Sequence, residues 1–164
     1  MSDDDFVSAD AGAAGTTPIR VGELKKGGMV MIKGHACKIV DYSTAKTGKH
    51  GSAKAMYVGI DIFTGNKHED TAPTGANTAA PVVERREWLL TDINDDDAND
   101  VGSIASLLDP EKGDTRDDLR IPDDKEYANM RAALLEDQKD VFVMVIEAVG
   151  KAKILPEFVQ KDRK

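Results

Sequence analysis

The segment with the clearest chemical potential is 43–54, Ser-Thr-Ala-Lys-Thr-Gly-Lys-His-Gly-Ser-Ala-Lys, where three lysines and a histidine stand among glycines. Its Gly48-Lys49 pair is also the core of the phosphate-binding P-loop. That loop requires glycine five positions before the pair and serine or threonine directly after the lysine. Here those positions hold Ser43 and His50. A strand pattern follows instead of a helix whose N-terminus could receive a phosphate, so the sequence argues against nucleotide binding.

A projecting hairpin tip fits this segment better. Gly48 and Gly51 bracket Lys49-His50 and permit the positive φ angles of a tight tip. Between Ser43 and Ala53 the apolar side chains are small alanines, which cannot hold the loop against a core. We therefore expect the loop to project into solvent. An ordinary solvated, lysine-rich loop explains the same spacing equally well.

The charge distribution favours a local interaction with phosphates in spite of a net charge of −8. Residues 19–90 carry eleven basic and seven acidic side chains, whereas residues 91–164 carry eleven basic and nineteen acidic ones. Within 33–54 there are five lysines against one acidic residue, Asp41. Phosphate binding depends on the local field more than on the total charge, so this segment is the candidate for contact with a nucleic acid.

The elements around the loop read as short strands separated by turns. Val30 and Ile32 indicate a strand that ends near Lys33 at a Gly34 turn, and 36–42 indicates another. Residues 55–63 alternate most clearly, with even-numbered Met56 to Ile62 on one face and odd-numbered Tyr57 to Phe63 on the other. Thr64-Gly65-Asn66 predicts a turn, and 82–90 a further strand. Many short strands without a helical period predict a small β-barrel.

Acidic segments mark the limits of this barrel. Residues 1–17 contain little apolar surface and are predicted to be a disordered acidic tail. The run 94–100, Asn-Asp-Asp-Asp-Ala-Asn-Asp, is predicted to be a solvated loop, because no glutamate follows at the spacing of a calcium loop. The charge balance reverses there, so we place a domain boundary near residue 90.

The second half combines strands with one helix. Asp123 or Asp124 can cap a helix in which Tyr127, Met130 and Leu134 share one face. The β-branched run 141–149 predicts a strand. These elements are compatible with an OB-type barrel, and equally with other small α+β domains.

The sequence argues against an enzyme or a metalloprotein. None of the three histidines, His35, His50 and His68, pairs with another at a metal-ligand spacing, and His35 and His68 read as turn residues. The lone cysteine, Cys37, stands among apolar neighbours and is predicted to be buried and inert. No run is long and apolar enough to span a membrane, and the first residues lack the pattern of a secretory signal. We therefore expect a cytoplasmic protein without catalysis, cofactor or metal.

Segment 43–51 is similar to the modification loop of the eukaryotic translation initiation factor 5A family. The likeness extends upstream through 33–34 and 37–40, downstream through 53–54 and 58–65, and to 115–122, Thr-Arg-Asp-Asp-Leu-Arg-Ile-Pro. Ser52 stands where the family usually has histidine, and Ala45 where it usually has serine. The segment 92–100 is longer and more acidic than the family pattern, and 154–164 shows no evident counterpart.

This resemblance implies a mainly β fold: an SH3-like β-barrel over 18–90 that carries the loop 43–54, then an OB-fold domain with one helix over 91–164. It also implies that Lys49 becomes hypusine, built from spermidine by deoxyhypusine synthase, which uses NAD, and by an iron-dependent deoxyhypusine hydroxylase. The resemblance assigns ribosomal RNA contact and recognition by the synthase to the neighbours of Lys49, which are Lys46, Thr47, Gly48, His50, Gly51 and Lys54.

The family binds the large ribosomal subunit near the exit site, and its hypusine reaches the acceptor end of the peptidyl-site tRNA. The resemblance therefore implies a factor that orients peptidyl-tRNA, relieves stalls during elongation and assists termination. An RNA-binding β-barrel that acts without modification is the alternative. It would carry aromatic residues among basic ones on a strand face, yet aromatic residues make up only 5% of the chain.

Overall fold

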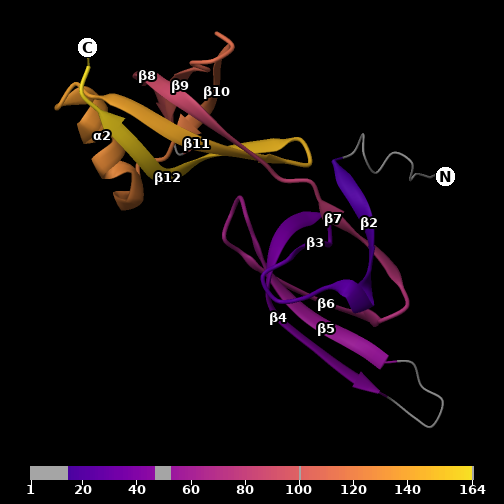
Figure 1. The fold of residues 1–164 in the computed structure, drawn as a ribbon. Coiled ribbons are helices and arrows are strands. Elements are labelled where there is room, and N and C mark those ends of the chain that lie inside the picture. The colour runs from indigo at the N-terminus through magenta and orange to yellow at the C-terminus, as the bar shows by residue number, and fades with distance from the viewer. Residues whose placement is uncertain (1–14, 47–52, 100, 164) are drawn as a thin grey trace. The chain divides into compact units, whose positions relative to one another are not determined.

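The chain is mainly β and divides into two compact units. The computed structural model describes residues 15–46, 53–99 and 101–163, except for the side chains of residues 96, 97 and 99. One unit comprises Met1–Val83 with Ala148–Lys151, and the other comprises Glu84–Glu147 with Ala152–Lys164 (Figure 1). The division falls earlier than the predicted boundary near residue 90, because one continuous strand begins at Glu84. Within the described residues, no helix has the length and apolar character that a membrane span requires.

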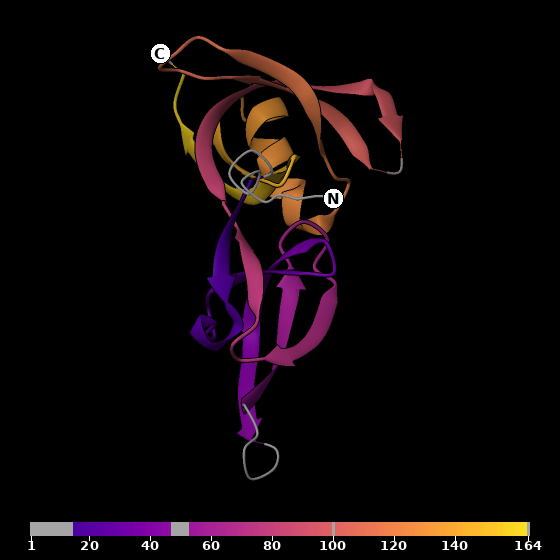
Figure 2. The same ribbon diagram turned by 90° about the vertical axis from the view of Figure 1, so that its right-hand side faces the viewer.

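The first unit contains only strands and one turn of 3₁₀-helix among its described residues. Its strands form a four-stranded antiparallel sheet of order β3-β4-β5-β6 and a separate pair, β2-β7 (Figures 1 and 2). The elements are β2 (Thr16–Arg20), η1 (Val21–Glu23), β3 (Met29–Ile32), β4 (His35–Lys46), β5 (Ala53–Asp61), β6 (Lys67–Pro73) and β7 (Asn77–Pro81). The predicted strands in 30–63 are confirmed, and β4 is longer than predicted at its C-terminal end.

The core of this unit is built on the odd-numbered face of β5. Ala55 and Tyr57 are buried, whereas Met56 on the other face is 57% exposed. The predicted division of 55–63 into two faces is therefore confirmed, and the odd-numbered face is the buried one. Gly59 also lies on this face. An added Cβ there would lie only 2.6 Å from the Cβ of Cys37, so the packing leaves no room for a side chain at this position. Cys37 is fully buried, as predicted, and burial together with Asp61 raises the pKa of its thiol to about 11.

The hairpin between β5 and β6 closes through Asp61. Its Oδ1 accepts hydrogen bonds from the backbone N–H groups of Phe63 (2.8 Å) and Thr64 (3.2 Å), and Gly65 takes the positive φ of 79° that the turn requires. Burial alone would raise the pKa of Asp61, but these two amides, the Thr64 side chain and the nearby His35 together outweigh burial, and the net shift is downward. The predicted turn at 64–66 is confirmed.

The second unit is a five-stranded antiparallel sheet of order β10-β9-β8-β11-β12 with one α-helix. The predicted strand over 141–149 and the predicted helix are both present. The elements are β8 (Glu84–Asn99), β9 (Gly102–Leu108), β10 (Thr115–Ile121), η2 (Lys125–Tyr127), α2 (Ala128–Leu135), β11 (Asp140–Ala148) and β12 (Lys151–Lys161). β12, which no pattern had indicated, forms one edge of the sheet.

The helical segment packs as its spacing predicts. Tyr127, Met130 and Leu134 are all buried in the core of this unit. The Tyr127 hydroxyl donates a hydrogen bond of 2.7 Å to the carbonyl of Ile154 on β12, so the start of the helix is bonded to the edge strand. Asp124 precedes the first turn, but its side chain makes no capping hydrogen bond, so the predicted cap is wrong in that respect.

The prediction that 94–100 is a loop is wrong for its described part, 94–99. β8 continues to Asn99 and pairs with β9, with partners Asn94 and Ile104, then Asn99 and Gly102, across an irregularity in register. The main chain of this ribbon is paired, while the side chain of Asp95 stays exposed and ion-pairs with Arg131 on α2. Asp and Asn are depleted in strands, but this preference reflects side-chain packing more than the backbone, so solvated carboxylates are compatible with a two-stranded ribbon.

The segment 115–122 supports the fold of this unit. Leu119 and Ile121 are buried. Arg116 pairs with Asp118 on its own strand at 2.7 Å and with Glu147 on β11 at 3.2 Å, and its guanidinium lies 5.7 Å from the ring centre of Trp88. These contacts cover the buried Trp88 and bond β10 to β11, so this motif is structural.

A second hairpin turn repeats the geometry of the first. Between β9 and β10, Asp109 Oδ1 accepts from the backbone N–H groups of Glu111 (2.8 Å) and Lys112 (3.1 Å), and Gly113 has a φ of 79°. The other carboxylate oxygen binds the guanidinium of Arg86. Arg86, followed by the amides, lowers the pKa of Asp109 to about 2.

Candidate nucleic-acid interface

The ribbon formed by β4 and β5 leads to the predicted modification loop. The strands stay paired up to Ala45 with Lys54 and Lys46 with Ala53, so the two ends of 47–52 are held as strand neighbours (Figure 1). Lys49 and the predicted contact residues Thr47, Gly48, His50 and Gly51 lie outside the described residues.

The end of β4 leaves the core before it reaches this loop. Beyond an irregularity in pairing between Ile39 and Asp41, the residues from Asp41 to Lys46 are exposed except for the half-buried Tyr42. Tyr42 lies opposite Tyr57, and its hydroxyl donates a 3.0 Å hydrogen bond to the carbonyl of Val21. This bond joins the base of the ribbon to the barrel, while the following residues extend into solvent.

The two described lysines of the predicted site, Lys46 and Lys54, are both exposed and lie on opposite faces of the ribbon. Lys54 is directly opposite Ala45, and Lys46 is directly opposite Ala53. Because successive side chains of a strand point to opposite faces, the two ammonium groups flank the ribbon from both sides.

The outer face of the sheet β4-β5-β6 does not carry one continuous basic patch. Lys38 and Lys67 lie in one row across the sheet, at the end remote from the loop. The next row places the carboxylates of Asp41 and Glu69 on either side of Val58, and Lys54 follows two rows later. The carboxylates therefore separate two groups of lysines. Near the loop, the positive charge of the described residues comes from Lys46 and Lys54.

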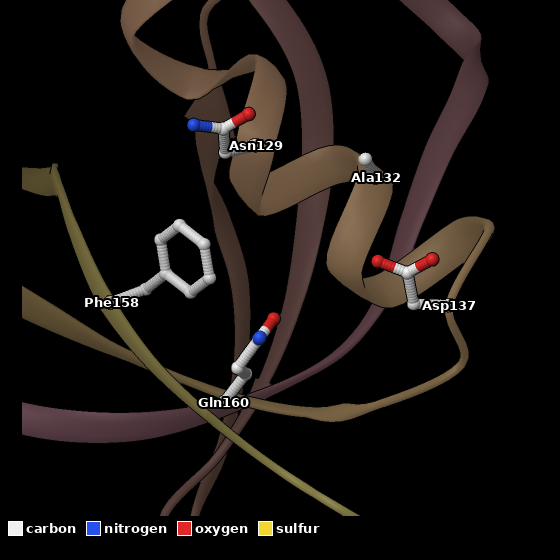
Figure 3. Close-up of a pocket in the computed structure, with 5 residues that line it drawn as sticks. All are labelled: Asn129, Ala132, Asp137, Phe158 and Gln160. Carbon is white, nitrogen blue, oxygen red and sulfur yellow. The ribbon is translucent and has the colours of Figure 1, made fainter.

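The second unit contains a pocket of about 440 Å³ between the end of α2 and β12. Figure 3 shows the ring of Phe158 and the amide of Gln160 on the strand opposite Asn129, Ala132 and Asp137. Its one ionisable side chain, Asp137, is acidic. The pocket therefore does not favour a phosphate group.

Comparison with known proteins matches both halves of the chain. Residues 14–76 match the family described as translation initiation factor 5A-like, N-terminal. Residues 82–156 match the family described as eukaryotic elongation factor 5A hypusine, DNA-binding OB fold.

Individual relatives agree with these matches. Eukaryotic translation initiation factor 5A-2 of Caenorhabditis elegans is 46% identical over 153 residues, 93% of this chain and 91% of the relative. A solved factor of this family from Naegleria fowleri has a TM-score of 0.73 and 42% identity, covering 87% of this chain and 97% of its own. The Methanococcus jannaschii protein has a TM-score of 0.67 and 38% identity, covering 88% of this chain and 96% of its own.

The two β domains and these relatives define the class: a translation factor, not an enzyme. The predicted fold class, an SH3-like barrel followed by an OB-fold domain with one helix, is confirmed. The chain belongs to the translation initiation factor 5A family.

Proposed function

We propose that this translation factor binds the large ribosomal subunit near the exit site and acts through hypusine formed on Lys49. The modified side chain orients the acceptor end of the peptidyl-site tRNA and so promotes elongation through stalls and termination. The observation that carries this proposal is the exposed end of the β4–β5 ribbon, whose last described pair, Lys46 and Ala53, flanks the segment that contains Lys49.

The placement of Lys46 and Lys54 suits insertion into a crevice. On a flat RNA surface, only one face of the ribbon would meet phosphates. Because these two lysines lie on opposite faces, both meet phosphates when the ribbon enters between two walls of RNA. Such contacts add affinity without reading sequence.

Elongation of Lys49 supplies reach and additional polar groups. Unmodified lysine is one compact, hydrated charge on a flexible stem. A 4-aminobutyl extension roughly doubles that reach and adds a second amine, and hydroxylation adds a further hydrogen-bonding group. The factor contributes orientation of the bound tRNA, and the ribosome contributes the chemistry.

This function requires deoxyhypusine synthase and deoxyhypusine hydroxylase as partners, spermidine as the source of the added group, and a cytoplasmic location. It requires no bound cofactor. Thr47, Gly48, His50 and Gly51 are proposed to contact the synthase and ribosomal RNA.

The intact mass of protein purified from its native cell tests the modification, with the peptide that contains Lys49 located by fragmentation. We expect a mass gain on Lys49 equal to an aminobutyl group plus one oxygen. Lys49→Arg keeps the charge but removes the acceptor amine, so it abolishes rescue of a cell that lacks the factor. Lys46→Arg is the matched control and retains rescue. Full rescue by Lys49→Arg, or functional protein with an unmodified Lys49, refutes the proposal.

The alternative of an unmodified RNA-binding barrel has less support on the described surface. Tyr42 and Tyr57 face inward, and the outer face of β4, β5 and β6 has no aromatic side chain among the described residues. Base stacking on that face is therefore absent, although stacking carries much of the binding in modules of this kind.

A further inference from the structure

Three metal-ligating side chains converge at the end of the β4–β5 ribbon opposite to the Lys46–Ala53 pair. His35 is the first residue of β4, Asp61 is the last of β5, and His68 is near the start of β6. Cys37 pairs with Asp61 and Gly59 pairs with His68, so the three side chains are diagonal neighbours on the same, inward face. Sequence spacing did not indicate this cluster, because each ligand comes from a different strand.

The donor atoms are close together. His35 Nδ1 lies 3.2 Å from Asp61 Oδ2, and His68 Nε2 lies 4.0 Å from the same oxygen. One ligand atom from each of the three residues lies within 4.8 Å of the others. Two ligands bound at 2.0–2.2 Å to a tetrahedral ion are about 3.3 Å apart, so the first distance already fits.

Both imidazole nitrogens are buried and make no hydrogen bond of good geometry, so their polar contact is the electrostatic one with Asp61 Oδ2. Buried polar atoms without a hydrogen bond are uncommon, since desolvation without a replacement bond is unfavourable. Asp61 itself is only 3% exposed. A metal ion would bind these two nitrogens and the carboxylate oxygen together, in place of the poorly aligned contacts between them.

We propose that His35, Asp61 and His68 form a binding site for one divalent transition metal of the zinc type. Two imidazoles and one carboxylate match the preferences of Zn²⁺, with water in the fourth position. The His35 side chain is 40% exposed, so the cluster lies close to the surface of the barrel. The imidazole rings are stacked, with centroids 4.2 Å apart and planes at 8°, so binding fans them apart and brings His68 closer to Asp61 by about 0.7 Å.

The hairpin turn holds the carboxylate in place for this role. The amides of Phe63 and Thr64 bind Oδ1 and leave Oδ2 directed at the histidines. Such outer hydrogen bonds orient a metal ligand before the ion arrives. The site lies in the barrel and is independent of the modification of Lys49.

Calorimetric titration of the full, tag-free chain with zinc chloride tests the site, with cobalt(II) absorption as the report on coordination. We expect one equivalent to bind and to raise the melting temperature, with reversal by a chelator. His35→Ala and His68→Ala each lower affinity by more than about tenfold, because loss of a ligand exceeds the effect of losing an outer hydrogen bond. Asp61→Asn keeps an acceptor for the turn and loses binding to a similar extent.

Two control variants separate this site from other donors of the chain. His50→Ala removes the third histidine and Cys37→Ala removes the only thiol, and both retain full affinity. The proposal is overturned if zinc does not bind, if His35→Ala and His68→Ala bind like the unaltered chain, or if His50→Ala or Cys37→Ala abolishes binding. Lys49→Arg, which is expected to lose rescue of a cell that lacks the factor, is expected to bind zinc with the affinity of the unaltered chain. The two proposals therefore fail independently of each other.

Discussion

Gly102 at the start of β9 provides a strict test of the packing in the second unit. Its φ is +110°, and a Cβ added there would lie 2.1 Å from the carbonyl oxygen of Ile121 and 2.8 Å from the Cα of Pro122. Both obstacles are backbone atoms, at the last residue of β10 and at the residue that follows it, so no side-chain rotation can relieve the overlap. Gly102→Ala must therefore shift β9 away from β10 or distort its own backbone.

The expected loss of stability has two parts. A side chain at positive φ costs about 1–2 kcal/mol, and overlap in a packed region adds about 1–3 kcal/mol. Gly113→Ala is the matched control, because Gly113 also has a positive φ, +79°, but nothing lies within 4 Å of an added Cβ. We expect Gly113→Ala to lose about 1–2 kcal/mol and Gly102→Ala to lose about 2–5 kcal/mol in total.

Urea unfolding followed by tryptophan fluorescence measures both variants. Trp88 is the single tryptophan of the chain and is 4% exposed in the core of the second unit, so its emission reports on that unit. The free energies of unfolding from the linear denaturant dependence give the difference between the variants. If the two variants lose equal stability, the close contact between Gly102 and Ile121 carries no cost and the reasoning is refuted.

Three further outcomes follow from named contacts. Asp109 has a folded pKa of about 2, below its unfolded value of about 3.9, so its contribution to stability is present above that unfolded value and is lost as the pH falls to about 2. Asp109→Asn removes the bond to Arg86, lowers the melting temperature at neutral pH and flattens its fall between those pH values; an unchanged pH profile would contradict this. Tyr127→Phe deletes the buried bond to the Ile154 carbonyl and lowers the urea-derived free energy of unfolding by about 1–2 kcal/mol, and no loss would show that the bond is unimportant. Lys46→Ala weakens ribosome binding and reduces the slope of log affinity against log salt by about 1 in co-sedimentation, whereas an unaltered slope would exclude a phosphate contact.

The periodicity of apolar residues along the sequence was sufficient to predict which faces of single helices and strands are buried. The helix face of Tyr127, Met130 and Leu134 and the alternation of 55–63 needed only the periods of helix and strand. The continuation of β8 to Asn99 was missed because the pairing with β9, and not side-chain preference, makes this acidic stretch a strand.

Contacts between distant strands could not be read from the sequence. The sequence around His35 and His68 is typical of turns, but each is part of a strand that borders β5. Their convergence on Asp61 depends on the register of three strands, which follows from the pairing and not from spacing. The motif around Lys49, in contrast, was recognisable because its residues are contiguous.

The turns at Asp61 and Asp109 share one arrangement, in which a single carboxylate oxygen accepts the hydrogen bonds of the turn. In each, the hairpin needs only one carboxylate oxygen, and the second oxygen is available to a different neighbour: two imidazoles in one unit and a guanidinium in the other. The neighbours can therefore be exchanged while the connection between strands is preserved. A new cationic or metal-binding side chain introduced beside either aspartate would therefore meet a carboxylate that the turn already holds in a fixed orientation.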